Sequence, residues 1–374
     1  MTATDTSIAH ESATRTLTAV DEAAAIERLH ELGCTDGLPV IVPTSERVER
    51  MVLATGLDPG DVLGTMGPLM GAATVEKVAT SAVMAGCLPD HVPVVVAALR
   101  AMCQPEFDLR EMQATTHCTA PLLIVNGPAR HACGGVASGF GVMGPGHRAN
   151  ASIGRAVRLA MINIGGARPG ESDMALHGHP GKFSFCIAED EEGSPFEPLH
   201  TTFGYDAEQS VCTVVGAEAP HSALFVGDAD EPDRSAEELL GIIASMIAAP
   251  GTNNVALGGH GSVIVVMNPD HTKVLADVGY DRARVQERLA DLAVVPIEVA
   301  RKLHPKRFAN FNGDHVKAIR DPARVHVLQA GGTGLYSMVM PTWSAGAHRN
   351  TAVHAEIELD QACEVPWATE LPEV

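Results

Sequence analysis

The chain has 374 residues, enough for one large α/β domain or two of ordinary size around a substantial core. Lysine and arginine total 26 against 46 aspartates and glutamates, which makes the formal net charge −20. A surface with this charge repels phosphate backbones and anionic lipids, so we expect neither nucleic acid nor a membrane as a partner.

The N-terminal residues 1–20 are polar and lack the apolar run of a secretory signal. No apolar stretch of the sequence is long enough to span a bilayer. We therefore expect a soluble cytoplasmic protein that begins with a disordered arm over residues 1–20. Cytoplasmic thiols stay reduced, and the eight cysteines contain no Cys-x-x-Cys pair, so neither a disulfide framework nor a zinc ribbon is expected.

Helical and extended patterns alternate along the chain. Residues 120–128 form a short apolar run closed by Asn-Gly-Pro, which predicts a buried strand. In 181–190, Phe183, Phe185 and Ile187 alternate with polar or small residues, which predicts a strand whose Cys186 faces away from the aromatic side chains. Helices are also predicted over 21–33, 46–56, 74–84, 93–102 and 235–249, and strands over 210–217, 222–227 and 261–269.

This alternation predicts an α/β fold with mixed, partly parallel sheets flanked by helices. The tripeptide Pro-Asp-His occurs at 89–91 and again at 269–271, and each copy leads into an apolar helix. The recurrence suggests two related α/β lobes. The first would cover 21–215, with a glycine- and arginine-rich central segment, and the second 216–374.

The central segment is GPGHRANASIGRAVRLAMINIGGARPG, residues 144–170. On a helix, its apolar residues form one stripe and its three arginines (148, 155 and 158) lie on the opposite side. The glycines before the helix and its free N–H groups suit a carboxylate or phosphate. We predict a substrate-binding group made of Arg148, Asn150, Arg155 and Lys182. The alternative is that the arginines pair with the acidic run 189–192 or remain in water.

Two short segments combine a thiol with an imidazole: TTHCTAP, with His117 and Cys118, and RHACGG, with His131 and Cys133. A neighbouring imidazolium and free backbone N–H groups stabilise a thiolate. In an extended segment His131 and Cys133 share a side, so this pair is the preferred base and nucleophile, with His117 and Cys118 as further catalytic candidates. The alternative for each cysteine is plain packing.

A third pattern offers ligands for a divalent metal. His177 and His179 could project together, with Glu189 supplying an oxygen ligand. No HExxH or other specific metal spacing occurs, so the alternative is a loop whose histidines bind nothing. Two glycine-rich loops, one around His260 and one over 329–343, could also close over a ligand.

The segments RANASIGRAVRLAMINIGGARPGESD and GHPGKFSFCIAEDEEGSP, with DGLPVIVPT and AVMAGCLPDHVPVVVAAL, resemble a family of bacterial proteins associated with UGSC-type selenoproteins. Together they span most of the chain. The resemblance implies a shared architecture rather than a defined reaction. The chain has no Cys-Gly-Ser-Cys motif, its nearest string being the one that starts at Cys133, so such a motif would lie on a partner protein.

We therefore predict a homo-oligomeric enzyme that acts on a small anionic, carboxylate-bearing substrate with thiol and imidazole assistance, at a site within residues 117–186. One alternative is a metal-dependent hydrolase or lyase that uses His177, His179 and Glu189. The other is a non-catalytic subunit that positions a small redox (seleno)protein.

Overall fold

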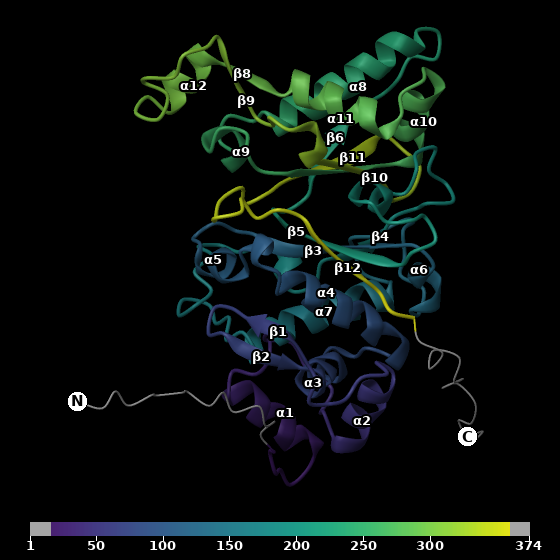
Figure 1. Cartoon of the computed structure of the whole chain (residues 1–374), viewed down its shortest axis with the longest axis vertical. Helices are drawn as coiled ribbons and strands as arrows, with labels where there is room; N and C mark the ends of the chain where they lie inside the picture. The colour runs from purple at the N-terminus through teal and green to yellow at the C-terminus, as the bar shows by residue number, and fades with distance from the viewer. Residues whose placement is uncertain (1–15, 360–374) are drawn as a thin grey trace.

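The computed structural model describes residues 16–359, which fold into four layers: helices, a four-stranded sheet, a second four-stranded sheet, and helices again (Figure 1). The prediction of an α/β fold with mixed sheets is confirmed. Most of the predicted arm over 1–20 lies outside the described residues. Among the described residues no helix is both long and apolar enough to cross a membrane.

The first sheet has the strand order β12-β5-β3-β4. Its parallel pair is β3 with β4, and β5 and β12 follow antiparallel. The apolar residues of β3 alternate: Leu123 points to the helices, whereas Leu122 and Ile124 point to the second sheet. Cys186 lies on the helix side, opposite to Phe185, as predicted. The strands are β3 (Ala120–Asn126), β4 (Cys186–Ala188), β5 (Val211–Ala217) and β12 (Val353–Glu356).

The second sheet has the strand order β10-β7-β11-β6. It repeats the directions of the first sheet, because β7 and β10 are parallel and β11 and β6 follow antiparallel. The strands are β6 (His221–Leu224), β7 (Val263–Met267), β10 (Val325–Gln329) and β11 (Tyr336–Pro341). The two lobes are thus related in strand order and direction.

The two sheets exchange edge strands. After β5 the chain crosses to the second sheet and forms β6, and after β11 it crosses back and forms β12. The predicted boundary near 215 therefore marks the first crossing, but 353–356 belongs to the first sheet. The Pro-Asp-His copies do not mark the relation between lobes, because 89–91 precedes β3 whereas 269–271 follows β7.

Helices cover the outer face of each sheet (Figure 1). The first sheet is covered by α4 (Val92–Met102) and α7 (Arg148–Asn163), and the second by α8 (Pro232–Ile247), α10 (Pro269–Asp277) and α11 (Arg282–Leu292). Below α4 and α7 lie α1 (Glu22–Glu31), α2 (Ser45–Leu53), α3 (Val75–Ala85) and the hairpin of β1 (Val62–Met66) and β2 (Gly71–Thr74).

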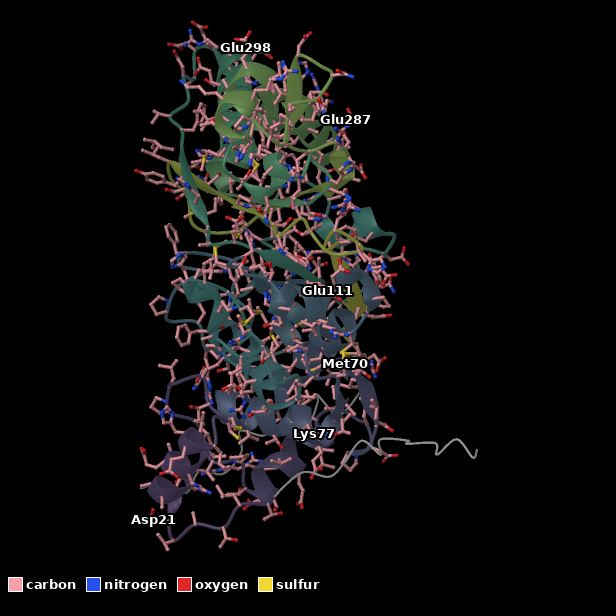
Figure 2. The ribbon with its side chains drawn as sticks, turned by 90° about the vertical axis from the view of Figure 1, so that its left-hand side faces the viewer. Asp21, Met70, Lys77, Glu111, Glu287 and Glu298 are labelled. Carbon is pink, nitrogen blue, oxygen red and sulfur yellow. The ribbon has the colours of Figure 1, made fainter. Side chains whose placement is uncertain are left out.

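Short elements complete the fold: α5 (Leu109–Ala114), α6 (Ala129–Ala132) and α9 (Asn253–Ala256). At the far end of the second lobe, the pair β8 (Val294–Pro296) and β9 (His315–Lys317) brackets α12 (Ile297–Leu303). Figure 2 shows the long axis of the molecule, with Asp21 near one end and Glu298 of α12 near the other.

The two sheets pack face to face through an apolar layer. Ile124 and Ile187 of the first sheet meet Ile264, Val266 and Leu328 of the second in one buried cluster. Burial of one such side chain stabilises the fold by about 1.5–3 kcal/mol. This layer joins the lobes into one core.

A buried ion pair also joins the lobes. Glu189, directly after β4, is fully buried, and its Oε1 accepts a hydrogen bond of 2.8 Å from Nη2 of Arg282 in α11. Asn126 and the backbone N–H of Leu199 donate to the other carboxylate oxygen. The carboxylate is therefore fully engaged in cross-lobe and local contacts.

We expect Arg282→Ala to lower the free energy of unfolding by about 3–5 kcal/mol, because it leaves the Glu189 carboxylate buried without its cation. Arg288→Ala, on the same helix, is the control: its pair with Glu237 is exposed (side chains 40% and 44%), so its loss should stay below about 1 kcal/mol. Urea denaturation at pH 7 measures both. Equal losses would contradict the role given to the buried pair.

His326 of β10 makes stability depend on pH. It is buried, neither ring nitrogen has a hydrogen-bond partner among residues 16–359, and burial lowers its pKa to about 3. Below pH 6.5 the unfolded chain therefore binds a proton that the native protein does not, and stability falls as the pH drops toward 3. We expect His326→Gln to reduce the stability difference between pH 7.5 and 5.5 by about 1 kcal/mol.

Urea denaturation at both pH values gives this difference. His131→Gln, in which the replaced side chain is 71% exposed, should leave the difference unchanged. A pH dependence that is the same in wild type and His326→Gln would show that His326 is not responsible.

Candidate functional site

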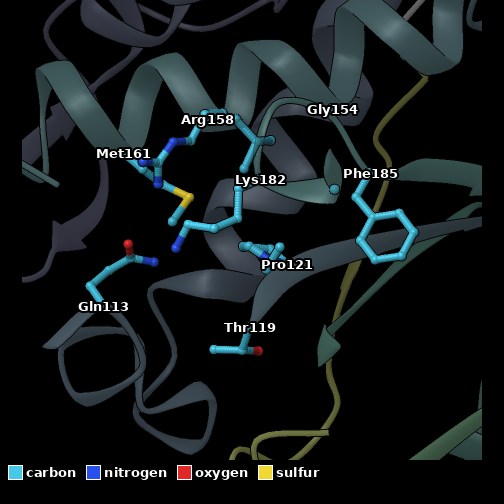
Figure 3. Close-up of a pocket in the computed structure, with 11 residues that line it drawn as sticks. Gln113, Thr119, Pro121, Gly154, Arg158, Met161, Lys182 and Phe185 are labelled. Atoms are coloured by element: carbon cyan, nitrogen blue, oxygen red, sulfur yellow. The ribbon is translucent and has the colours of Figure 1, made fainter. Parts of the chain in front are cut away.

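A recess lies between α7 and the start of β3. It is narrow, with about 10 Å³ of space for the centre of a water molecule, which is room for about one water. Helix α7, helix α5, the start of β3 and the turn at 180–185 line it. The side chains that line it include Gln113, Thr119, Pro121, Arg158, Met161, Lys182 and Phe185 (Figure 3).

A glycine in α7 sets the shape of this recess. A Cβ atom on Gly154 would lie 2.4 Å from Oγ of Ser184 and 2.6 Å from the backbone nitrogen of Phe185. Only glycine therefore lets the 184–185 segment pack this closely on the helix. This packing holds the turn that carries Lys182 next to Arg158, one helical turn beyond Gly154.

Two cations share one carboxylate in the recess. Asp173 is buried, and Nη2 of Arg158 and Nζ of Lys182 lie 2.9 Å and 3.0 Å from its oxygens. Burial would raise the pKa of Asp173, but the two positive charges outweigh it and hold that pKa below its usual value. The cluster keeps one positive charge in excess. In Figure 3 the side chains of Arg158, Lys182 and Gln113 converge on the same space.

The pKa of Lys182 lies below that of an ordinary lysine. Burial lowers its pKa most, Asp173 acts in the opposite direction, and the neighbouring Arg158 lowers the pKa further. A thiolate at Cys118 would raise it, so the sulfur lies within electrostatic reach of the ammonium group. The recess thus has a cysteine near a desolvated lysine.

Several polar atoms at the recess are buried and unpaired. Oε1 of Gln113 and Oγ1 of Thr119, both in side chains of residues that are 1% exposed, have no hydrogen-bond partner among the described residues. An unsatisfied buried group costs about 1–3 kcal/mol, and native proteins usually satisfy such groups with water or a ligand. Both atoms are shut off from solvent, so a bound molecule would reach them only after neighbouring side chains move.

Two histidines lie beside the recess. Nε2 of His117 lies 2.8 Å from Oε1 of Glu218, which leaves the buried Nδ1 as the nitrogen without a partner. Burial lowers the pKa of His179, the carbonyl of Ala217 raises it, and Lys182 lowers it further. An imidazole oriented by a carboxylate through one nitrogen can exchange a proton through the other.

The preferred pair of the sequence analysis is not formed. Residues 129–132 form the short helix α6 rather than an extended segment, so His131 and Cys133 do not share a side. Cys133 is fully buried in the core, whereas His131 is exposed and lies 3.3 Å from Glu192. The cysteine and histidine near the recess are instead Cys118 and His117, the further catalytic candidates.

Three of the four predicted substrate-binding residues have other roles. Arg148 is exposed and donates to the carbonyl of Gly86, and the Asn150 amide bonds the backbone of Ala137 and Val142. Arg155 binds both carboxylate oxygens of Asp36 and two backbone carbonyls, which fixes residues 36–39 on α7. Lys182 alone lies in the recess. Neither Arg155 nor Arg158 pairs with the acidic run 189–192.

The predicted metal centre is not assembled. His177 is exposed, His179 lies beside the recess, and Glu189 is engaged by Arg282 and Asn126. Within residues 16–359 no group of three or more His, Cys, Asp or Glu side chains could hold a metal ion. The three residues fail to converge because Glu189 follows β4 directly and turns toward the second lobe.

Sequence reasoning missed Gln113, Asp173 and Glu218 as parts of one binding region. The sequence pattern places Arg158 on the cationic face of the helix but not in the predicted binding group, because the pattern cannot tell which arginine meets a cavity. Glu218 carried no signal, because 101 residues separate it from His117.

We expect Arg155→Gln to lower the free energy of unfolding by about 2 kcal/mol or more, because the nearly buried Asp36 carboxylate loses its bidentate partner. Arg148→Gln, on the same helix but exposed, should change it by no more than about 0.5 kcal/mol. Thermal and urea denaturation compare the two. If Arg155→Gln left the free energy of unfolding unchanged, Arg155 would not have this structural role.

Comparison with known proteins adds no assignment: no protein-family model matches the chain, and no curated protein matches it either.

Proposed function

We propose that the chain is an enzyme that acts on a small carboxylate-bearing substrate in the recess, with imidazole and thiol assistance. One observation carries the proposal: Arg158 and Lys182 converge on a recess whose lining also includes Gln113 and Thr119, each with a buried polar atom that has no partner among the described residues. As it stands the recess has room for about one water molecule, so side chains that line it would move apart to admit a substrate.

The substrate carboxylate would lie against Arg158 and Lys182. Guanidinium groups bind carboxylates through two parallel hydrogen bonds, and the excess positive charge of the cluster balances the bound anion. Oε1 of Gln113 can accept, and the Thr119 hydroxyl can donate or accept, so a substrate hydroxyl or carbonyl would satisfy them. The apolar side chains of Met161 and Phe185 exclude water from the rest of the recess.

We assign proton transfer to His117 and nucleophilic assistance to Cys118. Oε1 of Glu218 accepts a hydrogen bond from the N–H at Nε2 of His117, which leaves Nδ1 as the nitrogen that would take up a proton. Cys118 is half-buried, and its sulfur lies within electrostatic reach of the Lys182 ammonium group. This arrangement replaces the pair first expected at His131 and Cys133.

A comparison of two alkylating reagents tests the proposal without a known substrate. Iodoacetate carries a carboxylate and iodoacetamide does not; with either, the thiolate forms a carbon–sulfur bond and iodide leaves. For each cysteine we take the ratio of its modification rate with iodoacetate to its rate with iodoacetamide. If the recess binds carboxylates, this ratio should be at least tenfold higher at Cys118 than at Cys103. Cys103 is partly exposed in the same chain and serves as the internal reference. Peptide mass spectrometry follows both cysteines.

Arg158→Gln should abolish the preference for iodoacetate at Cys118, whereas Arg148→Gln, with the same charge change on the same helix, should retain it. Malonate should slow the modification of Cys118 in wild type only. Equal relative rates at Cys118 and Cys103 would contradict a carboxylate site at the recess.

A further inference from the structure

We propose that a second, open groove at the far end of the second lobe binds a phosphate-bearing ligand with a planar ring, of the size of a nucleoside diphosphate. The groove lies between the glycine-rich loop before β7 and the segment after α12. The residues that form it include Gly258, His260, Arg307, Phe308, Phe311 and Arg320.

The groove is basic on a strongly acidic protein. The chain carries a net charge of −20, yet the groove is lined by Arg307, Arg320 and His260 and by no acidic side chain. Within residues 16–359, neither arginine forms an ion pair, and the Arg307 side chain makes no hydrogen bond. Burial lowers the pKa of His260, and the positive charges of Arg320, Arg349 and Arg324 lower it further. Uncompensated guanidinium groups of this kind suit phosphate.

One wall of the groove is aromatic and held in place. Phe308 and Phe311 meet edge to face, with ring centroids 6.0 Å apart. Arg301 of α12 donates to the carbonyl oxygens of both residues, at 3.3 Å and 2.8 Å, which fixes the turn that carries the two rings. Phe308 is only 4% exposed and packs in the core of the second lobe, where it supports the half-buried ring of Phe311. One supported ring beside two arginines favours a ligand that combines a flat apolar part with an anionic part.

The opposite wall is also preformed. Gly258 and Gly259 have φ angles of +82° and +77°, a left-handed conformation that favours glycine. Nε of Arg320 donates a hydrogen bond of 2.6 Å to the carbonyl oxygen of Gly258. The backbone N–H of Arg320 donates to the carbonyl oxygen of Gly259. The bond from Nε holds the guanidinium at the groove and leaves its terminal nitrogens toward solvent, because the residue is exposed.

Size and position agree with a ligand site. The groove is wide open to solvent and offers about 510 Å³ of space, within the range of sites for small ligands. It lies just before β7, the first strand of the parallel pair in its sheet, as the recess lies at the start of β3, the first strand of the parallel pair in the other sheet. Related lobes thus present positive charge at corresponding ends of their parallel strand pairs.

Isothermal titration of the full chain with ADP tests the proposal. We expect ADP to bind with a dissociation constant at or below the millimolar range, pyrophosphate to bind at least fivefold more weakly, and adenosine more weakly still. Arg307→Gln should weaken ADP binding tenfold or more; its side chain is exposed and unbonded, so the variant should melt at the wild-type temperature. Arg110→Gln, an exposed arginine in the first lobe, carries the same charge change and should stay within twofold.

Arg158→Gln should bind ADP normally, which separates this groove from the recess. The proposal is overturned if ADP does not bind at millimolar concentration, if pyrophosphate binds as tightly as ADP, or if Arg307→Gln binds ADP as wild type does.

Discussion

The structure depends on the apolar layer between its two sheets. Every central strand must bury both faces, one against helices and one against the other sheet, so its side chains are apolar on both sides, as Leu122 and Leu123 show. The exchange of β6 and β12 ties the lobes further, because each sheet gains an edge strand from the chain that comes from the other lobe. Neither lobe keeps its full sheet or its inner apolar cover without the other.

Several ionised side chains are buried within this fold. Three carboxylates that are buried or nearly so are each matched to a cation: Glu189 to Arg282 across the lobes, Asp36 to Arg155, and Asp173 to Arg158 and Lys182. The first two are balanced pairs that hold segments together. The third has one cation more than it needs and lies at a recess, and that difference separates a binding cluster from a structural pair.

Local pattern predicted much of the fold but only part of the site. Periodicity predicted the strand at 120–126, the helix of the central segment and the side of the strand on which Cys186 lies. Which side chains share a face of a helix or strand depends only on their spacing along the chain. The expectation for Cys133 and His131 failed because it assumed an extended segment. A single turn of helix there directs the thiol into the core and the imidazole to solvent.

The sequence by itself determined the alternation of helices and strands, the acidic surface and the cationic face of α7, since these depend on composition and on spacings of two to four residues. Only the tertiary structure decided which arginine meets a cavity. Arg155 and Arg158 lie on the same helix face three residues apart, yet one is bound by Asp36 and the other lines the recess with Lys182. The choice depends on loops brought to α7 from distant parts of the chain, and no local pattern records where those loops come to rest.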